Sequence, residues 1–131
     1  MNIKLGKYKI SQKSRPLLIG ELSCNHCGSI NLAKKIINEA KKQGVDLIKF
    51  QTYDADTMTL NSHKSIFKIK KGIWKGLNLW ELYDKAKTPF KWQKKLFDYA
   101  KKINLTAFST PYDISALRLL EKINCPIYKV A

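Results

Sequence analysis

Side chains capable of acid–base and ionic chemistry recur in this 131-residue chain where short apolar runs end. The runs cover residues 16–22, 45–52, 106–110 and 126–131, and the polar residues in or just after them are Glu21, Asn25, His26, Lys49, Gln51, Ser109, Thr110 and Lys129. Two lysines that meet at one point would bind a phosphate or a carboxylate. A carboxylate beside them could move a proton. These residue types therefore predict a site for an anionic substrate.

The apolar runs are typical of buried parallel strands, which contain few polar residues. Alternation along the second run puts Lys49 and Gln51 on one face and Ile48 and Phe50 on the other, as expected if the first face lines a barrel and the second packs under helices. Repeated strand–helix units imply right-handed crossovers and an α/β fold. A whole (β/α)₈ barrel needs about 250 residues. We therefore predict the N-terminal half of a TIM barrel, about four βα units, truncated after strand four.

Helix signals lie between the runs. Ser29 or Asn31 can start a helix that reaches about Gln43, and Gly44 ends it. A capping box predicts a helix over residues 79–86, Thr88 with Pro89 at the first helical position starts another that ends at Asn104, and Asp113 caps one to about Lys122. Residues 53–76 lack a clear period and are expected to form an ordered functional loop, with a possible hairpin.

The composition limits the class of protein. The formal net charge is +15, and all the basic residues except Arg15 and Arg118 are lysines. A basic nucleic-acid-binding module is the alternative from a different class, but base and phosphate readout favours arginine, so we expect no nucleic-acid partner. No apolar run is long enough for a membrane span, and the lysine-rich start lacks a secretory signal. With an odd number of cysteines, these features predict a cytoplasmic protein without a membrane partner.

Each motif also has a structural interpretation. Glu21, Lys49 and Lys129 could form a buried ion-pair network, although their grouping at strand ends favours a site. The C-x-x-C of Cys24 and Cys27 could bind metal or act in redox chemistry, but it lacks a second ligand pair of usual spacing, so we interpret these cysteines as ordinary small residues. The aromatic residues of 74–92 could stack on nucleic acid, but their helical spacing favours packing.

Four segments together resemble the sialic acid (N-acetylneuraminate) synthase family, in order and at suitable distances. They are Glu-Leu-Ser-Cys-Asn-His at 21–26, Ile-Lys-Phe-Gln-Thr at 48–52, Phe-Ser-Thr-Pro-Tyr at 108–112 and Tyr-Lys-Val-Ala at 128–131. The stretch from Gln51 to Trp92 is most similar to the pseudaminic acid synthase branch. The resemblance implies that residues 1–131 are the N-terminal part of a TIM-barrel catalytic domain, with the rest of the barrel and a C-terminal antifreeze-like domain absent.

The resemblance also implies a reaction. Family enzymes condense phosphoenolpyruvate with an N-acetylated amino sugar to give a nonulosonic acid and phosphate, for surface carbohydrate biosynthesis. The expected sugar is 2,4-diacetamido-2,4,6-trideoxy-altrose; N-acetylneuraminate or legionaminic acid synthesis is the alternative. The full-length enzyme is expected to be a homodimer that uses divalent Mn or Mg, whose ligands lie mostly outside these residues, and the 131 residues alone are expected to be inactive.

The resemblance assigns roles residue by residue. Glu21 and Lys49 match catalytic positions, with Glu21 beside the reacting carbons and Lys49 among the positions that hold the charged groups of phosphoenolpyruvate. The substrate-binding residues that it implies are Gln51, Ser109, Thr110, Lys129, Asn25, His26 and Tyr53. Asn25 and His26 are expected to shape the pocket. No metal ligand is assigned within the chain.

Overall fold

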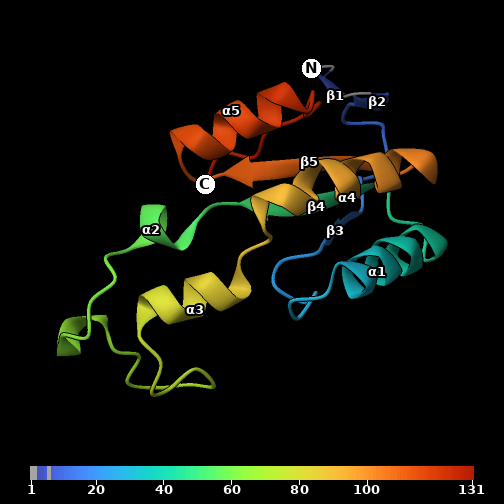
Figure 1. The fold of residues 1–131 in the computed structure, drawn as a ribbon. Coiled ribbons are helices and arrows are strands. Elements are labelled where there is room, and N and C mark those ends of the chain that lie inside the picture. Colours follow the sequence, from blue (N-terminus) through green and yellow to red (C-terminus); the bar gives the residue numbers. More distant parts are fainter. Residues whose placement is uncertain (1–2, 6) are drawn as a thin grey trace.

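The computed structural model describes residues 3–5 and 7–131 as two small sheets and a layer of helices (Figure 1). The elements in chain order are β1 (Ile3–Leu5), β2 (Tyr8–Ile10), β3 (Ile19–Glu21), α1 (Ile30–Lys42), β4 (Leu47–Thr52), α2 (Ala55–Met58), the 3₁₀ turn η1 (Ser65–Phe67), α3 (Leu79–Ala86), α4 (Phe90–Lys102), β5 (Thr106–Pro111) and α5 (Ile114–Lys122).

The central sheet is parallel and has the order β3-β4-β5. Its register pairs Glu21 with Lys49 and Gln51 with Thr110. The α/β fold expected from the sequence is therefore confirmed. The strand expected over residues 126–131 is not formed: one parallel bridge joins Tyr128 to Ser109, and Val130 is 88% exposed. In the part of the chain that the structure describes, this one bridge to β5 holds the segment at the edge of the sheet.

Capping side chains start the helices near the expected residues. The Ser29 hydroxyl accepts from Leu32 N–H (3.2 Å) at the start of α1, and the Asp113 carboxylate accepts from Ala116 N–H (2.7 Å) at the start of α5. The capping box at α3 is present. The expected start of α4 is wrong by one residue, because Pro89 is the N-cap and helical geometry begins at Phe90.

Three helices end in the same turn, in which one residue adopts a left-handed conformation. These residues are Gly44 (φ 80°), Asn104 (φ 56°) and Asn124 (φ 56°), the types that tolerate this region best. The next amide then donates to a carbonyl five residues earlier: Val45 to Ala40 (3.2 Å), Leu105 to Ala100 (2.9 Å) and Cys125 to Leu120 (2.9 Å). This arrangement satisfies carbonyls that a helix end leaves unpaired and turns the chain back towards the sheet.

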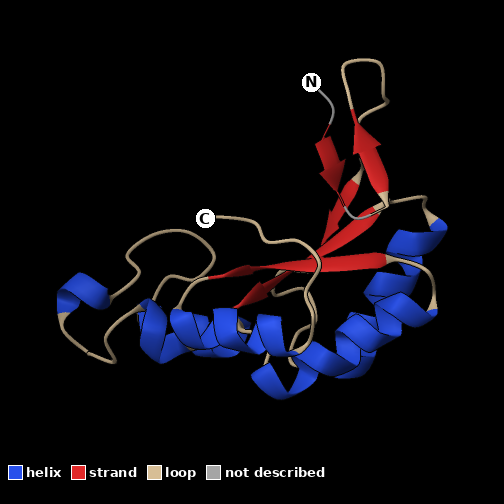
Figure 2. Cartoon of the chain, turned by 90° about the horizontal axis from the view of Figure 1, so that it is seen from above, coloured by secondary structure: helices blue, strands red, loops and turns tan. Residues whose placement is uncertain are grey.

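The long helices pack along one face of the three-stranded sheet, where they form the main core (Figure 2). Phe50 of β4 is fully buried and meets Phe97 of α4 edge to face, with ring centroids 5.3 Å apart. Burying a side chain of this size contributes about 1.5–3 kcal/mol. Ile48 faces the same helix layer, since a Cβ on Gly20 would lie near both Ile48 and Ala40 of α1. The expected division of β4 into a helix-covered face and a second face is therefore confirmed.

Two features lie outside the βα units: a hairpin that the sequence analysis missed and a long loop that it expected. Strands β1 and β2 form an antiparallel hairpin whose Leu5 and Tyr8 pack against the main core. Residues 53–78 hold α2 and η1, and an antiparallel bridge between Lys68 and Asn78 gives the expected hairpin in outline. Within the described ranges, no helix is long and apolar enough to cross a membrane.

Candidate active site

The carboxyl ends of β3 and β4 bring Glu21 and Lys49 together. Their Cα atoms are paired in the parallel register, and Lys49 Nζ lies 2.6 Å from Glu21 Oε1. The Lys49 side chain is only 12% exposed, whereas that of Glu21 is 55% exposed. Burying an ammonium without a partner would cost several kcal/mol, so the ion pair is what makes this position tolerable for lysine. The carboxylate edge of the pair remains open to solvent.

Gln51 and Thr110 extend the same sheet face. They occupy paired positions on β4 and β5, and Gln51 lies two residues beyond Lys49. The Gln51 amide Nε2 donates to Tyr112 Oη at 3.0 Å. Thr110 is buried, and its hydroxyl has no hydrogen-bond partner among the described residues. A buried hydroxyl without a partner costs about 1–3 kcal/mol, and such groups often mark a ligand site.

Lys129 belongs to this face by register. The bridge pairs Tyr128 with Ser109, so the next residue along, Lys129, lies beside Thr110 in the alternation. Its backbone N–H donates to Ser109 O at 3.1 Å. The Lys129 side chain is exposed and takes no part in the ion pairs found across the described residues. The structure thus unites Glu21 with Lys49 but leaves the Lys129 ammonium outside that contact.

Ser109 lies on the opposite face of the sheet. Its hydroxyl forms a hydrogen bond of 2.7 Å with Thr52 Oγ1, and both residues are fully buried. The two-residue alternation of a strand cannot place Ser109 and Thr110 on one face. Ser109 therefore joins the helix-covered core instead of the group around Lys49.

Tyr53 is 5% exposed and lies just beyond the end of β4, where its ring packs against two other tyrosines. It meets Tyr112 and Tyr83 edge to face, with centroids 5.6 and 5.9 Å away. Burial, with smaller contributions from the nearby Cys24 and from the two tyrosines, raises the pKa of Tyr53 to about 12. Tyr53 is therefore a neutral phenol that anchors the loop after β3, α3 and the end of β5 to one another.

The loop after β3 contains Asn25 and His26, which the structure places differently. Asn25 is exposed, whereas His26 is buried with its ring edge-on to Trp92 of α4 at 5.6 Å. His26 Nδ1 accepts from Gly28 N–H at 3.1 Å, so the neutral ring carries its proton on Nε2. Burial lowers the pKa of His26, an effect partly offset by the Ala86 backbone. His26 thus packs beneath α3 and α4.

This loop is also conformationally unusual. Both Ser23 and Cys27 have φ values of 46°, in the left-handed region that residues with a Cβ rarely adopt. Such conformations cost of order 1–3 kcal/mol each and are found most often at functional sites. Cys24 and Cys27 are free thiols.

The described residues contain no complete set of metal ligands. No group of three or more His, Cys, Asp or Glu side chains within residues 3–5 and 7–131 is arranged to hold an ion. The C-x-x-C therefore does not form a metal site with neighbouring ligands there. The divalent metal expected from the resemblance would need ligands from elsewhere.

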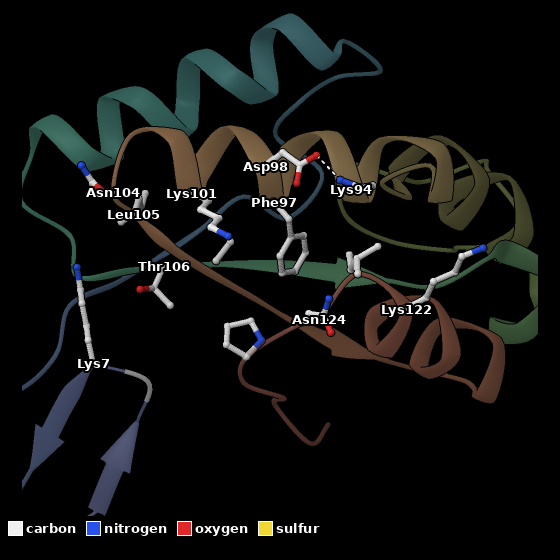
Figure 3. A pocket seen from close by; sticks show the side chains of 13 residues that line it. Lys7, Lys94, Phe97, Asp98, Lys101, Asn104, Leu105, Thr106, Lys122 and Asn124 are labelled. Carbon is white, nitrogen blue, oxygen red and sulfur yellow. Dashed lines mark hydrogen bonds and ion pairs between the residues drawn. The ribbon is translucent and has the colours of Figure 1, made fainter.

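A lysine-rich groove of about 620 Å³ lies at the amino end of β5, between α4 and α5 (Figure 3). Its lining includes Lys7, Lys94, Lys101 and Lys122 around an apolar floor. Lys101 and Lys122 are in the last turns of their helices, where a positive charge offsets the negative end of the helix dipole. The groove lies at the opposite end of β5 from Thr110, so it is separate from the group around Lys49.

Two residues at the candidate site were missed by the sequence analysis. Tyr112 had no role assigned, although it directly follows Pro111 at the end of β5. Gln93 is fully buried on α4, and its Nε2 donates to the backbone oxygen of Gln51 at 3.2 Å. A glutamine in the buried stripe of an otherwise apolar helix face was the signal that could have identified it.

Comparisons with known proteins identify the family of this chain. The family model described as "NeuB family" matches residues 36–131. The chain belongs to the NeuB family. Pseudaminic acid synthases of Helicobacter pylori and Campylobacter jejuni are 47% and 40% identical to it, over 88% and 98% of the chain. The resemblance to sialic acid synthases is therefore confirmed.

A solved relative supports the fold of this NeuB-family chain. The N-acetylneuraminic acid (sialic acid) synthetase of Leptospira borgpetersenii, crystallised with citrate, matches 99% of the chain with a TM-score of 0.80 and 28% identity. The chain covers 41% of that protein, and 34% and 37% of the two pseudaminic acid synthases. It therefore spans little more than a third of the length of the curated relatives that it matches.

Proposed function

We propose that the chain is the N-terminal part of a pseudaminic acid synthase. That enzyme condenses phosphoenolpyruvate with 2,4-diacetamido-2,4,6-trideoxy-altrose to give a nonulosonic acid and phosphate. The observation that carries the proposal is the buried Lys49, paired with Glu21 on a sheet face that also holds Gln51 and the unpartnered Thr110 hydroxyl. The identity to two pseudaminic acid synthases supports the choice of sugar.

The chemistry suits these residue types. Phosphoenolpyruvate carries a carboxylate and a phosphate, which Lys49 and Lys129 would neutralise and orient. Its methylene carbon attacks the aldehyde carbon of the open-chain sugar, which forms the new C–C bond. Water adds to the resulting cationic carbon, and the tetrahedral intermediate then expels phosphate. Glu21, whose carboxylate is half exposed, would transfer a proton at the aldehyde oxygen or at the attacking water.

The proposal keeps five of the residues expected from the sequence at the reacting end: Glu21, Lys49, Gln51, Thr110 and Lys129. Tyr53 and Asn25 would shape the pocket from the loops around it, and the buried His26 would support the loop after β3 from beneath α3 and α4. Ser109 is left out, because its hydroxyl is bonded to Thr52 on the other face of the sheet.

The larger assembly is also part of the proposal. Residues 1–131 would be the first half of a TIM-barrel domain, truncated after strand four, within a longer cytoplasmic protein that carries an antifreeze-like C-terminal domain and forms a homodimer. A divalent Mn or Mg ion would be held mostly by residues outside this chain. The 131 residues alone would then be inactive.

The test is an assay of the full-length protein with phosphoenolpyruvate and each of three sugars. The sugars are the diacetamido altrose derivative, N-acetylmannosamine and the legionaminic acid precursor, and the measurement is released phosphate. We expect the first sugar to give the highest kcat/KM; preference for either of the others would instead indicate an N-acetylneuraminate or a legionaminic acid synthase. No phosphate release with any sugar would refute the proposal.

A pair of lysine variants ties the activity to the site. Lys49→Ala should lower kcat/KM by at least 100-fold, the order expected when one charged transition-state partner is removed. Lys101→Ala is the matched control, because Lys101 lies in the groove at the other end of β5. Both variants should retain the native circular dichroism spectrum. Wild-type turnover in Lys49→Ala would contradict the proposed role.

A further inference from the structure

We propose that Tyr112 is a substrate-binding residue that donates its phenolic proton to an anionic oxygen of the substrate, beside an N–H of Gln51. The inference rests on the proposed function, because it concerns the same site and the same carboxylate- or phosphate-bearing substrate. It adds a residue whose role follows from the hydrogen bond between β4 and the end of β5.

The direction of one hydrogen bond carries the argument. Gln51 Nε2 donates to Tyr112 Oη over 3.0 Å, so the phenolic oxygen acts as an acceptor in this contact. A phenol has one proton of its own, and that proton must then point to another acceptor. Among the hydrogen bonds of residues 3–5 and 7–131, none is donated by the hydroxyl of the half-buried Tyr112, so its proton is available to solvent or to a ligand. The second N–H of the Gln51 amide is equally free.

The position of Tyr112 is fixed before any ligand arrives. Its backbone N–H donates to Thr52 O at 3.2 Å, which continues the pairing of β4 and β5. Its ring meets the buried Tyr53 ring at 79°. A donor held in this way loses little conformational freedom on binding, which is the condition for a strong and selective contact.

The neighbouring groups indicate what the donor would bind. Thr110 lies two residues before Tyr112 and has an unpartnered hydroxyl, and Lys49 is on the same sheet face as Thr110. These groups supply hydroxyl, amide and ammonium donors but only one carboxylate, that of Glu21, which is already paired with Lys49. Such a set matches the several oxygens of a small anion better than an uncharged sugar.

The experiment compares Tyr112→Phe with Tyr83→Phe in the full-length protein. Each change removes one hydroxyl from the same cluster of three rings and keeps the ring, but the Tyr83 hydroxyl makes no hydrogen bond to Gln51. We expect Tyr112→Phe to weaken phosphoenolpyruvate binding, measured by calorimetry without the sugar, by about 10- to 100-fold, as for loss of a hydrogen bond to a charged group. Tyr83→Phe should change it less than twofold.

Steady-state kinetics separate this role from a structural one. The KM for phosphoenolpyruvate should rise in Tyr112→Phe while the KM for the sugar stays within twofold, and thermal unfolding should be unchanged. Equal phosphoenolpyruvate affinity in the two variants would overturn the inference, as would a matching loss of affinity for both substrates. If the wild type forms product and Tyr112→Phe binds phosphoenolpyruvate with the wild-type affinity, only this inference fails. If wild type neither binds phosphoenolpyruvate nor releases phosphate, the proposed function fails as well.

Discussion

Replacing Thr110 with valine should make the protein more stable and less able to bind its substrate. The Thr110 hydroxyl is buried on the sheet face of Lys49 and has no hydrogen-bond partner among the described residues. Valine keeps the branched shape that suits a strand and replaces only the hydroxyl, with a methyl group of similar size. The folded protein then no longer bears the cost of an unpaired hydroxyl, whereas the ligand loses a donor.

The size of the effect follows from that burial. An unsatisfied buried hydroxyl costs about 1–3 kcal/mol, and the added methyl gains up to about 0.8 kcal/mol in apolar burial. We expect Thr110→Val to raise the free energy of unfolding by about 1–2 kcal/mol, which leaves room for imperfect packing of the methyl group. Loss of a hydrogen bond to a charged ligand should weaken phosphoenolpyruvate binding by about 10- to 100-fold.

Thr52→Val is the matched control. Thr52 is also fully buried on a strand, but its hydroxyl is bonded to Ser109 Oγ at 2.7 Å, so valine leaves the Ser109 hydroxyl without a partner. This change should lower the free energy of unfolding by about 1–3 kcal/mol. Urea unfolding of the full-length variants measures both, as opposite shifts in midpoint at constant slope. If Thr110→Val destabilises the protein as much as Thr52→Val does, the Thr110 hydroxyl has a structural partner and the reasoning is wrong.

Two further predictions concern the frame that positions the site. Asp46 is bonded to Arg15 (2.6 and 2.7 Å) and to the Leu18 N–H, and these contacts lower the pKa of its carboxyl from 3.8 to about 2. A carboxyl whose pKa is lowered on folding stabilises the fold above pH 3.8, and this contribution disappears as the pH falls towards 2. The free energy of unfolding should therefore change less between pH 3.8 and 2 in Asp46→Asn than in the wild type. An unchanged pH dependence would contradict the assignment. Gly44→Ala should lower the free energy of unfolding by roughly 1–2 kcal/mol in chemical denaturation because φ is 80° there, and a neutral effect would show that the turn can relax.

The helices and the division of β4 into two faces could be predicted because local signals determine them. Ser29, the Asn78 capping box and Asp113 start helices through contacts within one turn, and Asn104 ends one through its own backbone preference. Alternation along a strand is equally local. For the same reason, the joint assignment of Ser109 and Thr110 to one site could have been rejected from the sequence, since neighbouring strand residues face opposite ways.

What could not be predicted depends on contacts between distant segments. His26 is a plausible pocket residue by type, and only its packing against Trp92 shows that it lies under the helices. The β1–β2 hairpin was missed because each strand is three residues long with a central lysine, too short for alternation to stand out in a lysine-rich stretch. The role of Tyr112 required the bond to Gln51, which is 61 residues away in sequence.

The number of residues between the turn at Asn104 and the start of β5 determines which side chains of β5 face the site. The turn delivers the chain to β5 only two residues before the strand begins. Losing one residue from that junction would have to be absorbed by sliding β5 one step along β4. Every side chain of β5 would then swap sides, so that the Ser109 hydroxyl would lie on the sheet face of Lys49 and the Thr110 hydroxyl would point into the aromatic packing under α4. Deletions there would therefore act like simultaneous substitutions of both residues, even though the sequence Phe-Ser-Thr-Pro itself stayed intact.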